Sequence, residues 1–159
     1  CGAVVGANGA VGMCMVQAAV AVGAVVVAEA ADAPAAAAVA RGVDVLVDTT
    51  GRVVVGSVPE HLNTRGRIVV IAGRGRADLD LWSFYVREIQ LLGFVMSAMT
   101  VAELAAAAAW INSTPTVSVG RVLGFDHAAQ AHALIEDGRL PRMDDGTVGR
   151  LVLVPAAPD

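Results

Sequence analysis

The sequence predicts an α/β fold built on a parallel β-sheet. Short valine-rich runs recur along the chain, helix-forming stretches separate them, and a glycine-rich turn follows the first run. Strands that alternate with helices at this spacing form parallel sheets. Helices cover both faces of such sheets, so the strands are continuous apolar runs, and a chain with 56% hydrophobic residues fits that pattern.

Each element has its own sequence signal. Gly23 ends the first helix, Asp32 is the expected N-cap of the second, and Thr100 with Glu103 forms a capping box at the start of a later one. The expected strands are residues 3–5, 25–28, 43–51, 66–73, 89–97, 117–125 and 148–155. The expected helices are residues 10–22, 32–42, 57–63, 100–111 and 126–138, and residues 79–88 are helical or irregular.

The charge and the cysteines exclude several classes of function. The 159 residues carry a net charge of −4, and all 11 basic residues are scattered arginines, so no basic field attracts nucleic acid. Cys1 and Cys14 have no His or Cys at a metal-type spacing, so we expect no metal site in this chain. The cysteine content fits a reducing, cytoplasmic location.

The uncharged start of the chain raises the question of a membrane span, because no charge precedes Glu29. Glycines at positions 2, 6, 9, 12 and 23 divide this stretch, and its valines cluster at the two ends, as they do in strands. No Lys or Arg flanks its start, as an oriented span would require. A strand, turn, helix and second strand explain it better, and we expect no membrane association.

The segment AVVGANGAVG places Gly6, Gly9 and Gly12 between the first strand and the first helix. A helix N-terminus offers unpaired backbone N–H groups and a positive dipole end, which favour a phosphate. In dinucleotide sites the first glycine allows a tight turn, the second lets the phosphate approach, and the third lets helix and strand pack closely. A tight turn without a ligand is the alternative.

The end of the second strand bears on the choice of dinucleotide. Dinucleotide sites place an acid there for the ribose hydroxyls, or a basic residue for a 2′-phosphate. Glu29 lies near that place, Asp32 follows, and no arginine precedes Arg41. These residues favour NAD over NADP. The alternative is that Glu29 is only a solvated residue at the end of the strand and contacts no nucleotide.

The histidines and aromatic residues offer little chemistry, and no catalytic residue is assigned. His61 lies in a short polar helix and is expected at the surface. His127 and His132 are five residues apart, a spacing that does not place them on one helix face. Tyr85 fits an aromatic packing segment better than a proton donor, and Trp82 is expected to be a core or interface anchor.

Six segments form an ordered series along the chain: GANGAVGMCMVQAAVAVGA, GVDVLVDTTG, GRIVVIAG, FYVREIQLLGF, FDHAAQAHALIEDGR and GRLVLVP. This series resembles the medium-chain dehydrogenase/reductase family, which includes quinone oxidoreductases and zinc-type alcohol dehydrogenases, and in particular its quinone-reductase-like branch. Short-chain reductases share the glycine spacing, but their catalytic Tyr-x-x-x-Lys pair cannot exist in a chain without lysine.

The resemblance implies a Rossmann-like doubly wound parallel sheet that binds NAD or NADP across the carboxyl ends of its strands. The residues implied around the pyrophosphate are Gly6, Asn8, Gly9, Ala10 and Val11, with Glu29 near the adenine-side ribose. Those implied at the nicotinamide side are Thr49, Thr50 and Gly51 at the ribose, and Ile71, Ala72, Gly73, Phe94, Val95 and Met96 at the ring.

Two departures from the family pattern shape the expected domain organisation. The catalytic domain that holds the family's substrate cleft is not part of this sequence. Only residues 30–42 connect the second strand to GVDVLVD, so the sheet is expected to lack about one strand–helix unit. We expect one NAD(P)-binding domain over residues 1–159, whose tail 116–159 corresponds to the segment that returns to the catalytic domain. The strand at 148–155 must then find another partner.

Two functions stay open. The first is the nucleotide-binding part of an NAD(P)-dependent oxidoreductase that transfers hydride to a carbonyl or an activated alkene, incomplete as this chain alone. The second is a non-catalytic, shortened relative that acts as a structural or interaction module. Apolar surfaces that a catalytic domain would cover predict a larger assembly. It would be a homo-oligomer through the edge strand at residues 91–96, as the resemblance implies, or a complex with a complementary catalytic chain.

Overall fold

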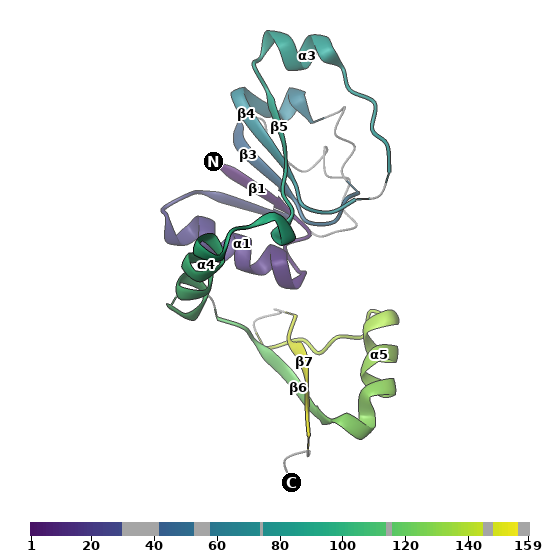
Figure 1. The fold of residues 1–159 in the computed structure, drawn as a ribbon. Helices are drawn as coiled ribbons and strands as arrows, with labels where there is room; N and C mark the ends of the chain where they lie inside the picture. The colour runs from purple at the N-terminus through teal and green to yellow at the C-terminus, as the bar shows by residue number, and fades with distance from the viewer. Residues whose placement is uncertain (30–41, 53–57, 74, 114–115, 145–147, 156–159) are drawn as a thin grey trace. The chain divides into compact units, whose positions relative to one another are not determined.

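The computed structural model describes residues 1–29, 42–52, 58–73, 75–113, 116–144 and 148–155 (Figure 1). The chain divides into two compact units, residues 1–115 and 116–159, and each is described by itself. The expected helix at 32–42, with its N-cap Asp32, lies outside the described residues. In the described part of the chain, no helix is both long and apolar enough to cross a membrane.

The first unit contains a five-stranded sheet in the order β2-β1-β3-β4-β5, in which all neighbouring strands are parallel. Its strands are β1 (Gly2–Val5), β2 (Val26–Glu29), β3 (Val43–Asp48), β4 (Leu62–Val70) and β5 (Gln90–Gly93). This order confirms the shortened Rossmann-like sheet, because β2 is an edge strand of the described sheet.

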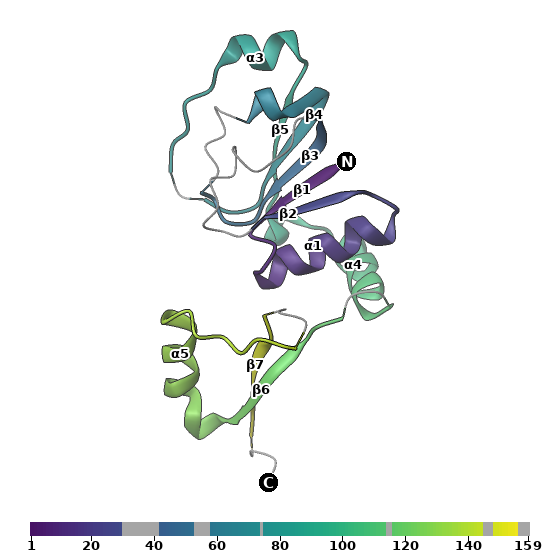
Figure 2. The same cartoon turned by 180° about the vertical axis from the view of Figure 1, so that it is seen from behind.

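The described helices of the first unit are α1 (Ala10–Ala21), α3 (Leu81–Val86), α4 (Val101–Ser113) and the 3₁₀ helices η2 (Pro59–His61) and η3 (Met96–Ala98). Of these, α1, η2 and α3 connect strands of the sheet, and η3 and α4 follow its last strand (Figures 1 and 2). Gly23, with φ +77°, follows α1 as expected. The capping box of α4 is also confirmed, because the N–H of Thr100 donates to Glu103 Oε2 (2.7 Å) and the N–H of Glu103 donates to Thr100 Oγ1 (3.3 Å).

A buried apolar cluster holds the sheet together. Its members are Ala3, Val43, Leu46, Val58, Leu62 and Ile68, each at most 1% exposed. Phe84 of α3 and Ile89 pack against this cluster, whereas Trp82 and Tyr85 of the same segment are 70% and 75% exposed. Of these aromatic residues only Phe84 packs against the core, whereas the exposed rings of Trp82 and Tyr85 contact each other with centroids 6.1 Å apart, and Trp82 is not a core residue. His61, expected at the surface, is partly buried, with a side chain only 18% exposed.

Several predicted boundaries are wrong for reasons of pairing, and the strand expected at 66–73 runs instead from Leu62 to Val70. The helix expected at 57–63 is a single 3₁₀ turn, and β4 already begins at Leu62, which is buried opposite Val43. The strand expected at 89–97 ends at Gly93. Gly93 pairs with Val70, the last residue of β4, so the ladder offers no partner for a longer strand.

The second unit contains β6 (Val119–Gly124), the 3₁₀ helix η4 (Phe125–His127), α5 (Ala128–Glu136) and β7 (Arg150–Val154). The two strands form a separate parallel pair, with Val122 opposite Val152. The partner that the last strand requires is therefore β6 of the same chain.

Candidate functional site

The glycine turn after β1 has the geometry that its sequence predicts. Gly6 has φ +80°, a conformation that favours glycine. A Cβ at Gly12 would lie 2.2 Å from the Gly6 carbonyl oxygen and 2.8 Å from the Ala7 Cα. Gly6 therefore allows the tight turn, and Gly12 allows α1 to approach it closely.

The N-terminus of α1 is open to a ligand. Asn8, Gly9, Ala10 and Val11 are exposed, and the N-cap Gly9 provides no side-chain hydrogen bond to the helix. The first N–H groups of a helix have no partner within it, and they add to the positive end of the helix dipole. This end of α1 can therefore bind an anionic group.

The turn after β3 is built around Asp48, a buried carboxylate that is 1% exposed. Its Oδ1 accepts hydrogen bonds from the N–H of Thr50 (2.8 Å), the hydroxyl of Thr50 (2.8 Å) and the N–H of Gly51 (3.1 Å). The neighbouring Thr49 hydroxyl donates to the Val5 carbonyl of β1 (2.8 Å). These bonds join the ends of β1 and β3.

The turn after β4 lies against the turn after β3. A Cβ at Gly51 would be 2.4 Å from the Gly73 Cα, so the two backbones touch. Two cavities open at this edge of the sheet. The larger, about 370 Å³, is lined by Val70, Ile71, Ala72, Gly73, Gly93, Phe94 and Val95. The smaller, about 210 Å³, is lined by Asp48, Gly51, Val70, Ala72, Gly73, Gly75, Arg76 and Ala77.

The structure thus brings the sequence-predicted residues to one edge of the sheet, at the carboxyl ends of β1, β3, β4 and β5. Five of the six residues expected at the nicotinamide ring line the larger cavity, whereas Met96 belongs to η3 beyond it. Glu29 ends β2 in register with Val5, and its side chain lies outside what the structure describes. A ligand that crosses the ends of a parallel sheet would meet this whole set.

Sequence reasoning missed Asp48 and Arg76. Asp48 is a charged residue at the end of the apolar strand VDVLVD, a position where burial needs hydrogen-bonding partners. A charged residue at the end of an apolar strand was therefore the sequence signal that could have identified Asp48. Arg76 lines the smaller cavity from a loop, and the paired arginines of GRGR were its only sequence signal.

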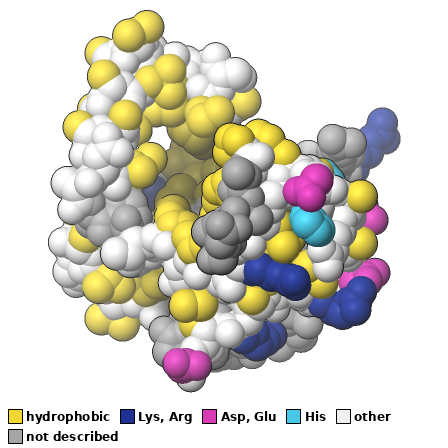
Figure 3. Space-filling view, turned by 90° about the horizontal axis from the view of Figure 1, so that it is seen from below, with side chains coloured by type: hydrophobic (Ala, Val, Ile, Leu, Met, Phe, Trp, Pro, Cys, Tyr) yellow, Lys and Arg dark blue, Asp and Glu magenta, His cyan; other side chains and the backbone are white. Residues whose placement is uncertain are grey.

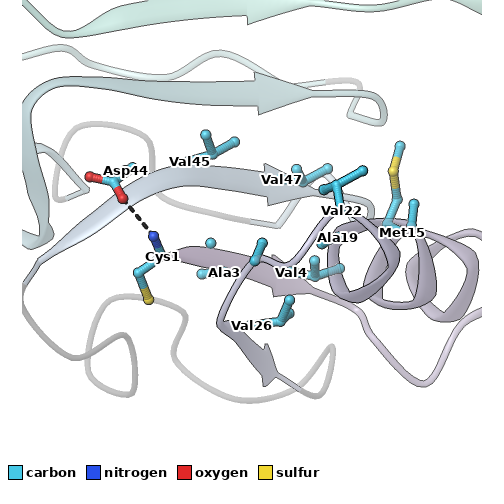
Figure 4. A pocket seen from close by; sticks show the side chains of 13 residues that line it. Cys1, Ala3, Val4, Met15, Ala19, Val22, Val26, Asp44, Val45 and Val47 are labelled. Carbon is cyan, nitrogen blue, oxygen red and sulfur yellow. Dashed lines mark hydrogen bonds and ion pairs between the residues drawn. The ribbon is translucent and has the colours of Figure 1, made fainter.

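A third cavity, more apolar than these two, lies elsewhere in the described part of the chain (Figure 4). It measures about 440 Å³ and is lined by residues of α1 from Met15 onward, by Val22 just after this helix, and by residues of β1, β2 and β3, among them Val45 and Val47. Its polar groups are the Cys1 amino group and Asp44, which form an ion pair at one end. The glycine turn does not line it, so it is separate from the candidate site.

A family model described as zinc-binding dehydrogenase matches residues 22–141 of the chain. Among curated proteins, none matches at a significant level. The family model covers well over half of the chain, and its match includes β3, β4 and β5 with the turns that follow them.

Solved structures of dehydrogenases and reductases share the fold. AibC is 27% identical with a TM-score of 0.76, and the match covers 98% of this chain and 49% of AibC. Crotonyl-CoA carboxylase/reductase AntE, solved in complex with NADP, is 17% identical with a TM-score of 0.74, covering 96% and 49%. An NAD-dependent alcohol dehydrogenase is 22% identical with a TM-score of 0.68, covering 96% and 50%. The chain therefore spans about half the length of these structures.

Proposed function

Because this chain belongs to the zinc-binding dehydrogenases of the medium-chain dehydrogenase/reductase family, we propose that it is the nucleotide-binding part of an NAD(P)-dependent oxidoreductase. The observation that carries the proposal is the glycine turn between β1 and α1, where the first residues of the helix are exposed and the N-cap is Gly9. The turns after β3 and β4 and the cavities beside them lie at the same edge of the sheet.

The described residues fit a dinucleotide. The N–H groups at the start of α1 would bind the pyrophosphate, and the exposed N-cap Gly9 carries no side chain that would obstruct its approach. Ile71, Ala72 and Phe94 form apolar walls that would orient the nicotinamide ring and exclude water from one side of it. The cofactor, when bound, supplies the hydride chemistry, and the protein supplies binding and orientation.

The described residues do not fit zinc. No three His, Cys, Asp or Glu side chains come together there in a way that could hold a metal ion. No step is therefore assigned to a metal held by this part of the chain.

The proposal also specifies the cofactor and the class of substrate. Glu29 at the end of β2 favours NAD, because a carboxylate accepts hydrogen bonds from ribose hydroxyls and repels a 2′-phosphate. The substrate is a carbonyl compound or an activated alkene, as in quinone reductases, and its cleft is supplied by a segment outside this chain. The second unit, residues 116–159, would join that catalytic part.

Assembly through the edge of the sheet belongs to the same proposal. All four residues of β5 are exposed, and Phe94, Val95 and Met96 beyond it are between 47% and 67% exposed. An open edge strand with apolar neighbours favours pairing with a second copy. We place this assembly in the cytoplasm, where the free thiols of Cys1 and Cys14 stay reduced.

An interaction module without catalysis is the second candidate. The observation that favours it is the amount of exposed apolar surface, with many hydrophobic and few charged side chains on the face drawn in Figure 3. On α3, Leu81, Trp82 and Tyr85 are each at least 70% exposed. Turnover of NAD(P)H with quinones or enals by the purified chain would exclude this candidate.

Calorimetric titration with NADH and with NADPH tests the proposal. We expect micromolar binding, with NADH the tighter ligand. Gly9→Val adds a side chain at the α1 N-terminus, where its Cβ would lie 3.1 Å from the Gly6 carbonyl oxygen, and it is expected to abolish binding by crowding the glycine turn. Gly2→Ala at the opposite end of β1 adds a Cβ in ordinary contact, 3.7 Å from the Val45 oxygen, and serves as control. Absence of binding by the wild-type chain to either nucleotide would contradict the proposal.

A further inference from the structure

We infer that Thr49 is a positioning residue, whose hydroxyl ties the turn after β3 to the glycine turn and thereby sets the shape of the dinucleotide site. The inference rests on the proposed function. It assigns to Thr49 and its neighbours a role through the backbone rather than direct donation to the nucleotide.

The hydroxyl protons of both threonines are already used. The Thr49 hydroxyl donates to the Val5 carbonyl (2.8 Å), and the Thr50 hydroxyl donates to Asp48 Oδ1 (2.8 Å). A hydroxyl has one proton to donate. While these bonds hold, neither threonine can donate a hydrogen bond to a ribose, although each can still accept one.

The turn after β3 is fixed from within. The buried Asp48 carboxylate receives the N–H groups of Thr50 and Gly51 as well as the Thr50 hydroxyl, and the N–H of Arg52 donates to Thr50 Oγ1 (3.0 Å). Hydrogen bonds to a charged acceptor are stronger than neutral ones. The turn after β3 is therefore rigid, and it restrains the segments that pack against it.

The glycine turn packs directly against the turn after β3. A Cβ at Gly6 would be 2.4 Å from Thr49 Oγ1 and 2.6 Å from the Thr50 methyl carbon, so only glycine fits between them. Val5, the residue before Gly6, accepts both the N–H (3.2 Å) and the hydroxyl of Thr49. A displacement of Thr49 must therefore move the backbone that leads into the glycine turn and α1.

Replacing the hydroxyl by a methyl group isolates this role. Thr49→Val keeps the shape of the side chain but places a carbon where Oγ1 lies 2.8 Å from the Val5 oxygen. Thr49→Ser restores the donor. Thr64→Val is the matched control, because Thr64 is exposed in β4. Binding of NADH or NADPH, whichever the wild type binds more tightly, is measured at a temperature where circular dichroism shows every variant folded.

We expect Thr49→Val to weaken nucleotide binding about tenfold, because the glycine turn would no longer be held in the shape that binds the pyrophosphate, with Thr49→Ser within about twofold of wild type and Thr64→Val unchanged. Binding by Thr49→Val within about twofold of wild type, or no rescue by Thr49→Ser, overturns the inference. If Thr49→Val does not fold, Thr50→Val carries the test, with about a fivefold loss expected and an unchanged affinity overturning it. A wild-type chain that binds neither nucleotide overturns the proposed function itself.

Discussion

The two parallel strand pairs at the centres of the two units differ in how much of their surface is covered. In β1 and β3, Ala3, Val4 and Leu46 are at most 3% exposed. In the second unit every residue of β7 is only partly buried, and Val119 and Val122 of β6 are 46% and 39% exposed. Both pairs have the apolar composition of central strands, but only the first is buried along most of its length, since burial in the second is confined to Leu123 and Gly124 of β6.

The difference between the two pairs shows that parallel strands become buried only where other elements cover them. Parallel strands are stable when helices or further strands cover both faces, and a two-stranded sheet alone is marginal. β1 and β3 have neighbours on both sides in a five-stranded sheet, whereas β6 and β7 have only each other in the described part of the chain. The second unit therefore needs a covering partner that the first does not.

Separation of the two units gives the largest expected effect. We expect residues 1–115 to remain folded by circular dichroism and to bind the nucleotide within about threefold of the full chain, because the glycine turn and the cavities lie there. Residues 116–159 alone are expected to give the spectrum of an unfolded chain. A folded 116–159 fragment would break the comparison.

Core truncation in each unit has the next largest effect. Leu46→Ala in the buried cluster should cost about 2–5 kcal/mol of unfolding free energy. Leu153→Ala in the partly buried β7 should cost about 1 kcal/mol or less. Both tryptophans, Trp82 and Trp110, lie in the first unit, so urea unfolding followed by tryptophan fluorescence reports on that unit.

The fluorescence midpoint separates two outcomes for these variants. Leu46→Ala should lower the urea midpoint, and Leu153→Ala should leave it unchanged. An equal drop for Leu153→Ala would mean that the two units unfold together. The difference in burial between the strand pairs would then not produce a difference in stability.

The sequence predicts best those features that depend on residues close together in the chain. The capping box of Thr100 and Glu103 and the helix stop at Gly23 are of this kind, and so is the tight turn at Gly6. Strand ends were missed because a strand extends only as far as its partner, as Gly93 and Val70 show. Pairing of that kind joins residues more than twenty positions apart.

The candidate site follows the same rule. The edge of the sheet and most of the lining of the larger cavity were foreseen from the ordered segments. The bonds that join Thr49 to Val5 and bury Asp48 were not, because they depend on which strands become neighbours. No local pattern distinguishes a threonine that supports a turn from one that faces a ligand.

The cap of α4 gives the smallest expected effect. Hydrogen bonds from the backbone and side chain of Thr100 hold the pKa of the Glu103 carboxyl below its usual value of 4.5. The charged cap therefore stabilises the fold above that value, and its contribution is lost as the pH falls through the lowered pKa of the folded state. Glu103→Ala should lower the Tm slightly at pH 7 and leave it unchanged in acid. A difference that persists in acid would contradict this origin.

The most direct test of the account is a titration of the ¹⁵N-labelled chain with NADH, followed through its amide resonances. We expect shifts confined to the carboxyl edge of the five-stranded sheet, at Gly9, Gly12, Thr50, Gly51 and Gly73, with the residues around the apolar cavity of α1 unaffected. Shifts centred on Met15, Val22 and Val45, or no shifts at all, would contradict it.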